Sequence, residues 1–498
     1  MQYISTRNKK ISVSGAEAIV KGLSPGGGLF VPSEFPKLKK ADFNALGNMD
    51  YAERASFIIG KFLPELKGSL DEFTKNSYSK FDEQDGAPLV KLDNSLYMLE
   101  LWHGPTYAFK DVALTLLPSL LAASKQVVGN KNKTLVLVAT SGDTGKAALE
   151  GFKNADSIDV VVLYPTDGVS NLQKLQMQTT TGSNVKVYGI NGNFDDAQNA
   201  VKEIFACDES AKKLASKGIE LSSANSINIG RLLPQVVYYI SAYVDMLNAG
   251  DINFGDKINF CVPTGNFGNI LAGYYAMQMG LPVNKLICAS NKNNVLTNFF
   301  NSGTYDIKRE FYKTSSPSMD ILISSNLERL LFELSGRDDK LTASRIADLK
   351  SKNKYSITDK ELKKADEFLY ATWASEDDVS DMIAEYFDEY GYICDTHTAV
   401  ALSVYHDYLD TLDKEHFDED GEPKVPTVIV STASPYKFVK DVLEAIDEKP
   451  TGSDKKDVFL LEEVTALPVP DSLRDLFKMQ VMHKEVLGKD EIKEKIMV

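Results

Sequence analysis

The sequence predicts an α/β protein whose core is a parallel β-sheet covered by helices on both faces. Short apolar runs of strand length recur along the chain, and loops and helix-like stretches separate them. Clear examples lie at 134–139, 159–164, 185–190 and 258–262. Continuously apolar strands that alternate with helices are typical of parallel sheets buried between two helical layers. Ligands of such folds bind at loops beyond the carboxyl ends of the strands.

The composition is that of a folded protein and argues against two classes of partner. The 498 residues are 43% hydrophobic and 25% charged, which is typical of folded proteins. At one domain per about 150 residues, this length predicts two to four domains. The 55 basic and 70 acidic residues give a net charge of −15, whereas nucleic-acid-binding proteins usually carry a basic face. The N-terminus lacks the apolar run of a signal peptide, and no apolar run is long enough to span a bilayer. We therefore expect a cytoplasmic protein that binds neither nucleic acid nor membranes.

The four cysteines lie far apart and form no CxxC or Cys/His pattern with metal-ligand spacing. Three of them sit in apolar sequence surroundings, which is typical of buried thiols. We expect reduced cysteines and no metal site.

The chain begins with what we expect to be a separate small domain, residues 1–90. It contains a glycine-rich turn at 24–28 and a helical pattern at 51–62. A strand-like run at 95–101 then precedes an apolar helix at 112–123.

The second half of the chain continues the strand series and adds a polar insertion. Strand-like runs lie at 286–289 and 425–430. Between them, residues 335–390 are polar and helix-rich and contain no strand-like run. Residues 413–424 are predicted to be a charged loop, and 450–498 mix polar turns with a helical tail.

Lys110 lies where the 95–101 strand leads into the apolar helix, near the start of that helix. The positive potential of a helix N-terminus is unfavourable for an ammonium group. Burial and positive potential both lower the pKa of a lysine, and a neutral amine is a nucleophile. The segment therefore indicates a Schiff-base lysine. The alternative is an ammonium that reaches solvent along its apolar stem.

Residues 263–269 (PTGNFGN) form a glycine-rich loop between a strand and a helix. Glycine lets backbone N–H groups converge on an anion, and the helix N-terminus adds to the positive field. The loop is typical of a phosphate site but is not a P-loop, because no Gly-Lys-Ser/Thr follows. The alternative is a tight turn with a helix cap.

Residues 141–146 (SGDTGK) resemble a nucleotide-binding loop only superficially. Thr140 replaces the first glycine of that motif, and Ala147 replaces the hydroxyl residue that would hold magnesium. A loop of small residues that opens a helix can bind a substrate carboxylate instead. An ordinary strand-to-helix turn is the alternative.

Two further segments carry polar groups suited to ligand binding. Residues 222–231 place small polar side chains before Arg231, whose guanidinium suits a phosphate or carboxylate. Residues 431–438 follow a strand, and a hydroxyl there could bond a heteroaromatic nitrogen. Either segment could instead be an ordinary loop, and we expect His103 and His397 to be structural.

Together these segments resemble threonine synthase, a family of pyridoxal-phosphate (PLP) enzymes of fold type II. The opening residues 3–7 and 24–32 are similar to the N-terminal domain of that family. The 335–390 insertion resembles its longer class, found in fungi and enterobacteria. The motifs that carry the resemblance are HGPTYAFKD (103–111), SGDTG (141–145), SANSINIGRLLPQ (223–235), PTGNFGN (263–269), SPSMDILISSNLERLLFEL (316–334), DTHTAV (395–400) and STASPYKF (431–438).

The resemblance implies two αβα subdomains with parallel sheets, plus a small N-terminal domain over 1–90. The catalytic core is expected over 91–450, with a smaller mobile subdomain at 116–249. A C-terminal extension is expected over 451–498. The longer class favours a monomer, and a homodimer is the alternative.

The resemblance also assigns roles to residues. Lys110 is implied to be the catalytic lysine that binds PLP, and Thr432 to face the pyridine nitrogen. The cofactor phosphate is implied to lie against Gly265, Asn266, Phe267, Gly268 and Asn269. The residues implied to bind substrate are Ser141, Gly142, Asp143, Thr144, Asn225, Ser226, Asn228 and Arg231. Asn269 stands where relatives often have aspartate.

The implied enzyme is a carbon–oxygen lyase acting on phosphates, which makes L-threonine and phosphate from O-phospho-L-homoserine and water in the last step of threonine biosynthesis. Two alternatives stay open. One is a PLP lyase that releases phosphate and ammonia and leaves a 2-oxo acid. The other is a sensor that binds PLP or a phosphorylated metabolite without catalysis.

Overall fold

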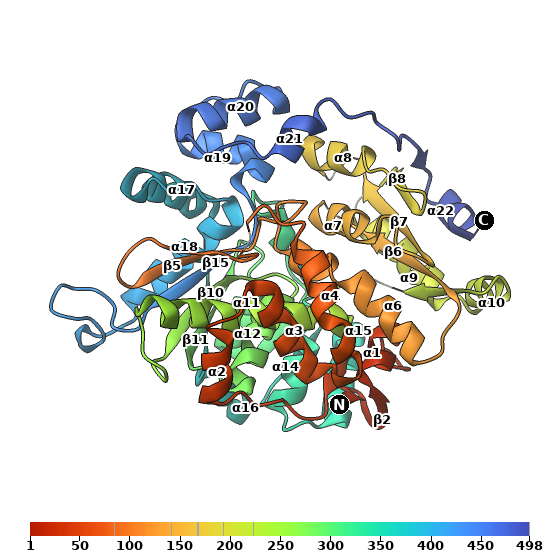
Figure 1. Ribbon diagram of the computed structural model, residues 1–498, viewed down its shortest axis with the longest axis horizontal. Coiled ribbons are helices and arrows are strands. Elements are labelled where there is room, and N and C mark those ends of the chain that lie inside the picture. Colours follow the sequence, from red (N-terminus) through yellow and green to blue (C-terminus); the bar gives the residue numbers. More distant parts are fainter. Residues whose placement is uncertain (84, 141, 167–168, 193, 223, 498) are drawn as a thin grey trace.

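The computed structural model describes residues 1–497 except 84, 141, 167–168, 193 and 223, and contains two parallel-stranded sheets beside a small N-terminal sheet (Figure 1). In Figure 1 the strands of the larger sheet lie on the left and those of the smaller sheet on the right. No helix in this part of the chain is both long and apolar enough to cross a membrane.

The larger sheet has six strands, which are parallel except for the last. Their order is β14 (Leu369–Trp373), β11 (Val283–Ser290), β10 (Ile258–Pro263), β15 (Thr427–Ser431), β5 (Leu96–Glu100) and β4 (Leu89–Lys91). The strands expected at 95–101, 258–262, 286–289 and 425–430 are confirmed.

Both faces of this sheet are buried, as its apolar strands require. Along β10, Phe260 and Val262 pack in the core shared with α11 (Ile229–Ala249) and α12 (Gly268–Met279). Cys261 points to the opposite layer, where its thiol lies 3.1 Å from the carbonyl oxygen of Ala401 in α18 (Thr396–Asp410).

The smaller sheet has five parallel strands. Their order is β16 (Val486–Leu487), β8 (Val185–Ile190), β7 (Ile158–Pro165), β6 (Lys133–Ala139) and β9 (Ile219–Ser222). One face packs on α7 (Asp143–Phe152). The other face is covered by α9 (Phe194–Ala206), α10 (Asp208–Ser216) and α22 (Glu491–Met497).

The N-terminal sheet is antiparallel, in the order β2 (Asn8–Ser14), β1 (Gln2–Ser5) and β3 (Phe30–Pro32). Its helices are α1 (Gly15–Lys21), α2 (Lys40–Leu46), α3 (Tyr51–Phe62) and α4 (Lys67–Tyr78), and α3 matches the helix expected at 51–62. The limits of the three domains and of the mobile subdomain stay predictions.

Helix α11 is buried along nearly its whole length. It contacts α3 of the N-terminal region, α12 of the larger sheet and α5 (Lys110–Leu114). A single rigid helix therefore connects the regions that surround the candidate site, and its first turn carries Arg231.

The expectation that 335–390 contains no strand is wrong. The helices α15 (Asp339–Lys352), α16 (Asp359–Asp366) and α17 (Glu376–Tyr390) are present as expected, but β13 (Lys354–Ser356) and β14 lie between them. β13 pairs with β12 (Thr304–Asp306), and β14 adds an edge to the larger sheet. Both strands are short and only partly buried, so neither shows a continuous apolar run.

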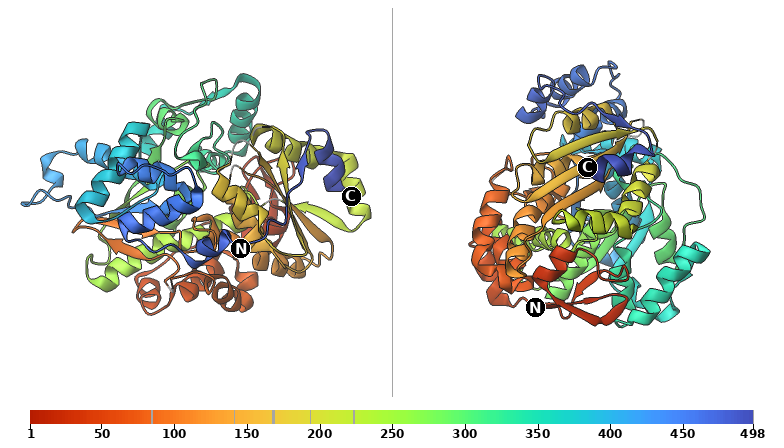
Figure 2. Two further views of the ribbon diagram at one scale, coloured as in Figure 1. Left: turned by 90° about the horizontal axis from the view of Figure 1, so that it is seen from above. Right: turned by 90° about the vertical axis from the view of Figure 1, so that its right-hand side faces the viewer.

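The C-terminal segment is more than a helical tail. Helices α19 (Val439–Ala445), α20 (Asp454–Thr465) and α21 (Asp471–Leu476) belong to the core beside α18. The chain then crosses to the smaller sheet, where β16 pairs with β8 (Figure 2). A two-residue strand leaves no periodic pattern in the sequence.

We predict that Gly151→Ala destabilises the protein. A methyl group there would lie 2.1 Å from the carbonyl oxygen of Leu114, where α7 crosses α5. Forced overpacking of this kind costs about 1–3 kcal/mol, which urea denaturation would measure as a lower free energy of unfolding. Gly68→Ala in α4 is the control, because its methyl group meets open space. Equal stability of the two variants would contradict the close packing of α5 on α7.

Candidate active site

Two loops that are far apart in sequence run side by side at the carboxyl edge of the larger sheet. The N–H of Phe109 donates to the carbonyl oxygen of Thr432 at 2.9 Å, and the N–H of Ser434 donates to that of Tyr107 at 3.1 Å. These two bonds form an antiparallel bridge between Ala108 and Ala433, just beyond the ends of the parallel strands β5 and β15. They bring Lys110, the first residue of α5, next to Thr432.

The loop before Lys110 is held in an unusual backbone conformation. Tyr107 has a φ of 59°, which is uncommon for a residue other than glycine. The buried carboxylate of Asp111 closes the turn by accepting from the N–H and hydroxyl of Thr106, each at 2.7 Å. Burial raises the pKa of Asp111 to about 6.

Lys110 is a buried amine, with a side chain only 11% exposed. Its Nζ lies 3.2 Å from Oδ2 of Asp143 and 3.4 Å from the hydroxyl of Ser318. Burial lowers the pKa of Lys110, and the nearby cations Lys437 and Arg231 act in the same direction, against the effect of Asp143. The amine is therefore more often neutral than a lysine in water.

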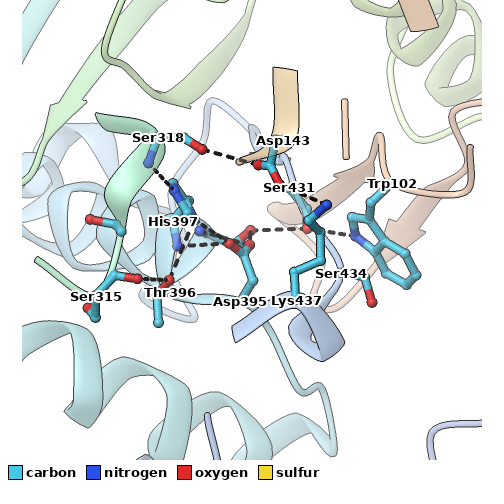
Figure 3. A network of polar contacts seen from close by, with 12 residues as sticks. Trp102, Asp143, Ser315, Ser318, Asp395, Thr396, His397, Ser431, Ser434 and Lys437 are labelled. Carbon is cyan, nitrogen blue, oxygen red and sulfur yellow. Dashed lines mark hydrogen bonds and ion pairs between the residues drawn. The ribbon is translucent and has the colours of Figure 1, made fainter. Parts of the chain in front are cut away.

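Asp143 is the carboxylate that joins the groups around Lys110, and Figure 3 shows its contacts with Ser318 and Lys437. Besides Lys110, it accepts from Lys437 at 2.7 Å, Ser318 at 3.1 Å and Gln173 at 2.8 Å. Burial alone would raise the pKa of Asp143, but Lys437 and Lys110 hold it well below the usual range. Asp143 is the first residue of α7, so the start of this helix faces Lys110.

His397 belongs to a chain of polar contacts beside this cluster (Figure 3). Its Nε2 accepts from the N–H of Ser318 at 3.1 Å, and its Nδ1 lies 2.8 Å from Oδ2 of Asp395. Because Nε2 is an acceptor, Nδ1 carries the proton and donates to Asp395. Asp395 also caps α18. His397 therefore fixes the turn that carries Ser318, which fits a structural role.

His103, the other histidine considered in the sequence, pairs with Glu100 at 2.7 Å and stacks on Trp102. Glu100 also accepts from the hydroxyl of Tyr392 at 2.8 Å. These contacts account for His103 without a ligand.

The 263–269 loop joins β10 to α12 and leaves the first N–H groups of that helix without a side-chain cap among the described residues. Gly265 is tightly enclosed, since a Cβ there would lie 2.9 Å from Cδ1 of Ile321 and 3.0 Å from the carbonyl oxygen of Ser318. Phe267, at the helix start, has a φ of 61°. The free N–H groups and the close backbone approach are the features that an anion needs.

Residues 324–326, to which the sequence assigned no role, hold the 263–269 loop in place by hydrogen bonds. The hydroxyl of Ser324 donates to the carbonyl oxygen of Gly265 at 2.6 Å. The N–H and side-chain amide of Asn326 both donate to the carbonyl oxygen of Asn266, at 3.2 and 3.1 Å.

Asn269 uses its side chain to contact α11. Its Oδ1 accepts from the hydroxyls of Tyr238 at 2.5 Å and Tyr239 at 2.7 Å. Its buried Nδ2 has no partner. An aspartate at this position would accept the same two bonds.

Arg231 is a buried cation with an unused donor. It is 5% exposed, and its Nη1 donates to the carbonyl oxygen of Ala224 at 2.8 Å. Its Nε has no hydrogen-bond partner among the residues that the structure describes. It makes no ion pair with any residue in the described ranges. Burial lowers the pKa of Arg231 to about 10. Burying a charge without a counter-ion is costly, so the group is suited to an anionic ligand.

The other candidate substrate residues differ in how far their side chains are engaged. Asn228 accepts from the N–H of Gly230 and donates to the carbonyl oxygen of Ile19, and therefore caps α11. The hydroxyl of Ser226 accepts from Asn326 at 2.8 Å. Asn225 and Thr144 are half-buried.

In the other glycine-rich loop, the N–H of Gly142 donates to the hydroxyl of Thr140 at 2.9 Å. Ser141 lies outside the described residues. Three site residues were not predicted from the sequence: Lys437, Ser318 and Gln173. Each belongs to the site through its contact with Asp143, and no local sequence pattern indicates that contact.

The chain matches two known protein families in sequence. Residues 2–78 match the family described as threonine synthase N terminus, and residues 81–431 match the pyridoxal-phosphate dependent enzymes. Threonine synthase of Pseudomonas aeruginosa is 37% identical, over 94% of this chain and 96% of that protein. Threonine synthase-like 1 of Homo sapiens is 38% identical over 94% of this chain, which spans 64% of the human protein's length.

Two solved structures share the fold over nearly the whole chain. PLP-bound threonine synthase from Brucella melitensis has a TM-score of 0.87 at 34% identity and covers 100% of this chain and 99% of that one. Threonine synthase from yeast also has a TM-score of 0.87, at 32% identity, and covers 99% of this chain and 98% of that one.

The described residues fit PLP. The buried amine of Lys110 suits its aldehyde, and the uncapped start of α12 behind the enclosed Gly265 suits its phosphate. The chain therefore belongs to the threonine synthase family of fold type II PLP-dependent enzymes.

Proposed function

We propose that the protein converts O-phospho-L-homoserine and water to L-threonine and phosphate. The observation that carries the proposal is Arg231, a buried guanidinium that has an unpartnered Nε and lies close enough to Lys110 to affect its charge. A planar guanidinium binds phosphate through paired hydrogen bonds. A phosphorylated amino acid would supply the missing anion.

The cofactor would be held by residues on both sides of the larger sheet's carboxyl edge. Lys110 would bind its aldehyde, and the backbone of Gly265, Asn266, Phe267, Gly268 and Asn269 would hold its phosphate. The hydroxyl of Thr432 would face the ring nitrogen. When bound, PLP supplies the electron sink that allows a proton to be removed from the substrate Cα.

The protein's own groups then have distinct tasks. As a general base, the neutral amine of Lys110 takes a proton from Cα and later one from Cβ. Two protons return to the substrate, one at Cγ and one at Cα, while water gives its hydroxyl to Cβ and its remaining proton to the phosphate. Arg231 holds the phosphate that leaves from Cγ. Gly142, Asp143 and Thr144 lie at the start of α7, where the substrate carboxylate is expected. The substrate lies among buried groups, which limits loss of the reactive intermediate to water.

We further propose that the smaller subdomain, 116–249, closes on the substrate, and that the protein acts as a cytoplasmic monomer. Contacts of Asp143 with Lys110, Ser318 and Lys437 already join that subdomain to the rest of the site. Small-angle scattering with and without substrate would detect the closure.

The direct test is to incubate the protein with PLP and O-phospho-L-homoserine and to measure phosphate, threonine and 2-oxobutyrate together. Equimolar phosphate and threonine are expected. Phosphate with 2-oxobutyrate and no threonine would replace the proposal with the lyase. No phosphate from protein that carries PLP would replace it with another substrate or with sensing.

We predict that Lys110→Ala folds normally but loses the Schiff-base absorbance with PLP. Turnover should fall by at least about a hundredfold, since general-base catalysis contributes factors of this size. Absorbance and threonine release measure the two effects. Lys133→Ala, which removes an exposed lysine of β6, is the control. Full activity of Lys110→Ala would refute its role.

Arg231→Ala should weaken the use of O-phospho-L-homoserine without preventing PLP attachment. The loss of a charge-assisted hydrogen bond, worth about 1.5–3 kcal/mol, predicts a roughly 10- to 150-fold fall in kcat/KM. Arg337→Ala, which removes an arginine paired with Glu333 at the end of α14 (Leu327–Leu334), should leave kcat/KM unchanged. Unaltered kinetics in Arg231→Ala would exclude Arg231 from the phosphate site.

A further inference from the structure

A second buried lysine shares the carboxylate that faces Lys110. Lys437 lies on η4 (Pro435–Phe438), shortly after Thr432, and its side chain is 2% exposed. Its ammonium donates to Oδ1 of Asp143 at 2.7 Å (Figure 3). It also donates to the carbonyl oxygen of Thr106 at 2.8 Å. Asp143 is its single carboxylate partner among the residues that the structure describes.

The two lysines occupy different oxygens of the same carboxylate. Lys110 contacts Oδ2 of Asp143, together with the hydroxyl of Ser318. Lys437 contacts Oδ1, together with the side-chain amide of Gln173. The carboxylate is therefore bound on both sides, and loss of the Lys110 charge would leave the bond to Lys437 in place.

We propose that Lys437 is a positioning residue that keeps Asp143 ionised and correctly oriented while Lys110 changes its charge. The inference rests on the proposed function in one respect: it takes Lys110 as the residue that binds PLP. Lys110 must lose its positive charge to act as a nucleophile or a base. A fully buried carboxylate with no remaining cation would take up a proton or move. Lys437 supplies a cation that takes no part in the reaction.

The charges around Lys110 determine how its charge state changes when Lys437 is removed. The groups that face its amine are Asp143 from α7, Ser318 from η2 (Pro317–Met319), Lys437 from η4 and Arg231 from α11. On the far side, His397 acts on Asp143 only through Ser318, whose N–H donates to Nε2 of His397 and whose hydroxyl donates to Asp143. Removing Lys437 removes a cation that repels the Lys110 ammonium, and it leaves Asp143 to pair with Lys110 alone. Both changes favour the charged form of Lys110 and therefore raise its pKa.

Direct binding of substrate by Lys437 is the competing role. Its ammonium already donates to two acceptors, and its side chain is almost fully enclosed. The contacts therefore favour action through Asp143 over contact with a substrate anion.

The test follows the attachment of PLP to the apoprotein as a function of pH, by the appearance of Schiff-base absorbance. Lys437→Met should move the midpoint of this profile upward by about one pH unit, which corresponds to roughly tenfold slower attachment below the midpoint. Lys437→Arg retains the charge and should stay near the wild-type profile. Lys440→Met, which removes a nearby lysine with a half-exposed side chain on α19, is the matched control and should not shift it.

A second variant tests the route through Asp143. Asp143→Asn removes the carboxylate but leaves the repelling cations, so it should move the midpoint downward. In that background, the further change Lys437→Met should add less than about half the shift that it causes in the wild type. If Lys437→Met fails to fold, Lys437→Gln removes the same charge and should give the same upward shift.

An unchanged midpoint in Lys437→Met, with a raised KM for O-phospho-L-homoserine, would overturn the positioning role in favour of substrate contact. A shift of equal size in the presence and absence of Asp143 would also overturn it. Failure of the wild-type apoprotein to attach PLP at any pH would overturn both this inference and the proposed function, whereas the other outcomes leave the proposed function standing.

Discussion

The arrangement of the site depends on the parallel pairing of β5 with β15. These strands are separated by more than 300 residues of sequence, yet they lie side by side with Val430 opposite Leu99 and Ser431 opposite Glu100. Because they are parallel, their carboxyl ends leave the sheet at the same edge. Just beyond the strands, an antiparallel bridge that includes the bond from Phe109 to Thr432 joins the two loops. Lys110 and Lys437, which follow β5 and β15, therefore both reach the buried carboxylate of Asp143.

Buried charge is distributed so that each carboxylate near the site already has hydrogen-bond donors. Asp111 is occupied by Thr106, Asp395 by His397 and the start of α18, and Asp143 by the two lysines. Arg231 is the cation left over, with carbonyl contact and no counter-ion in the described structure. A site with more buried cations than available carboxylates is suited to a ligand that brings negative charge.

The sequence allowed prediction of the parts of the fold that rest on local patterns. Continuous apolar runs located the central strands of both sheets because those strands are buried on both faces. Edge strands were missed, since β14 is half-exposed and β16 has two residues. Lys110 was predicted as a candidate site residue because an ammonium group is unfavourable at the start of a helix. The contacts of Asn228 and Lys437 could not be predicted from residue type. Asn228 caps α11, and Lys437 pairs with Asp143.

The short strand β16 changes what the smaller sheet presents to its surroundings. Without it, β8 would be an edge, and the N–H groups of Gly189 and Asn191 would lose the carbonyl partners that Glu485 and Leu487 provide. An uncovered edge strand carries unpaired N–H and C=O groups, and a second chain can pair with them as an added strand. The residues of β16 therefore cover this edge of β8, and proteolysis between α21 and β16 would uncover an edge on which a second chain could add a strand.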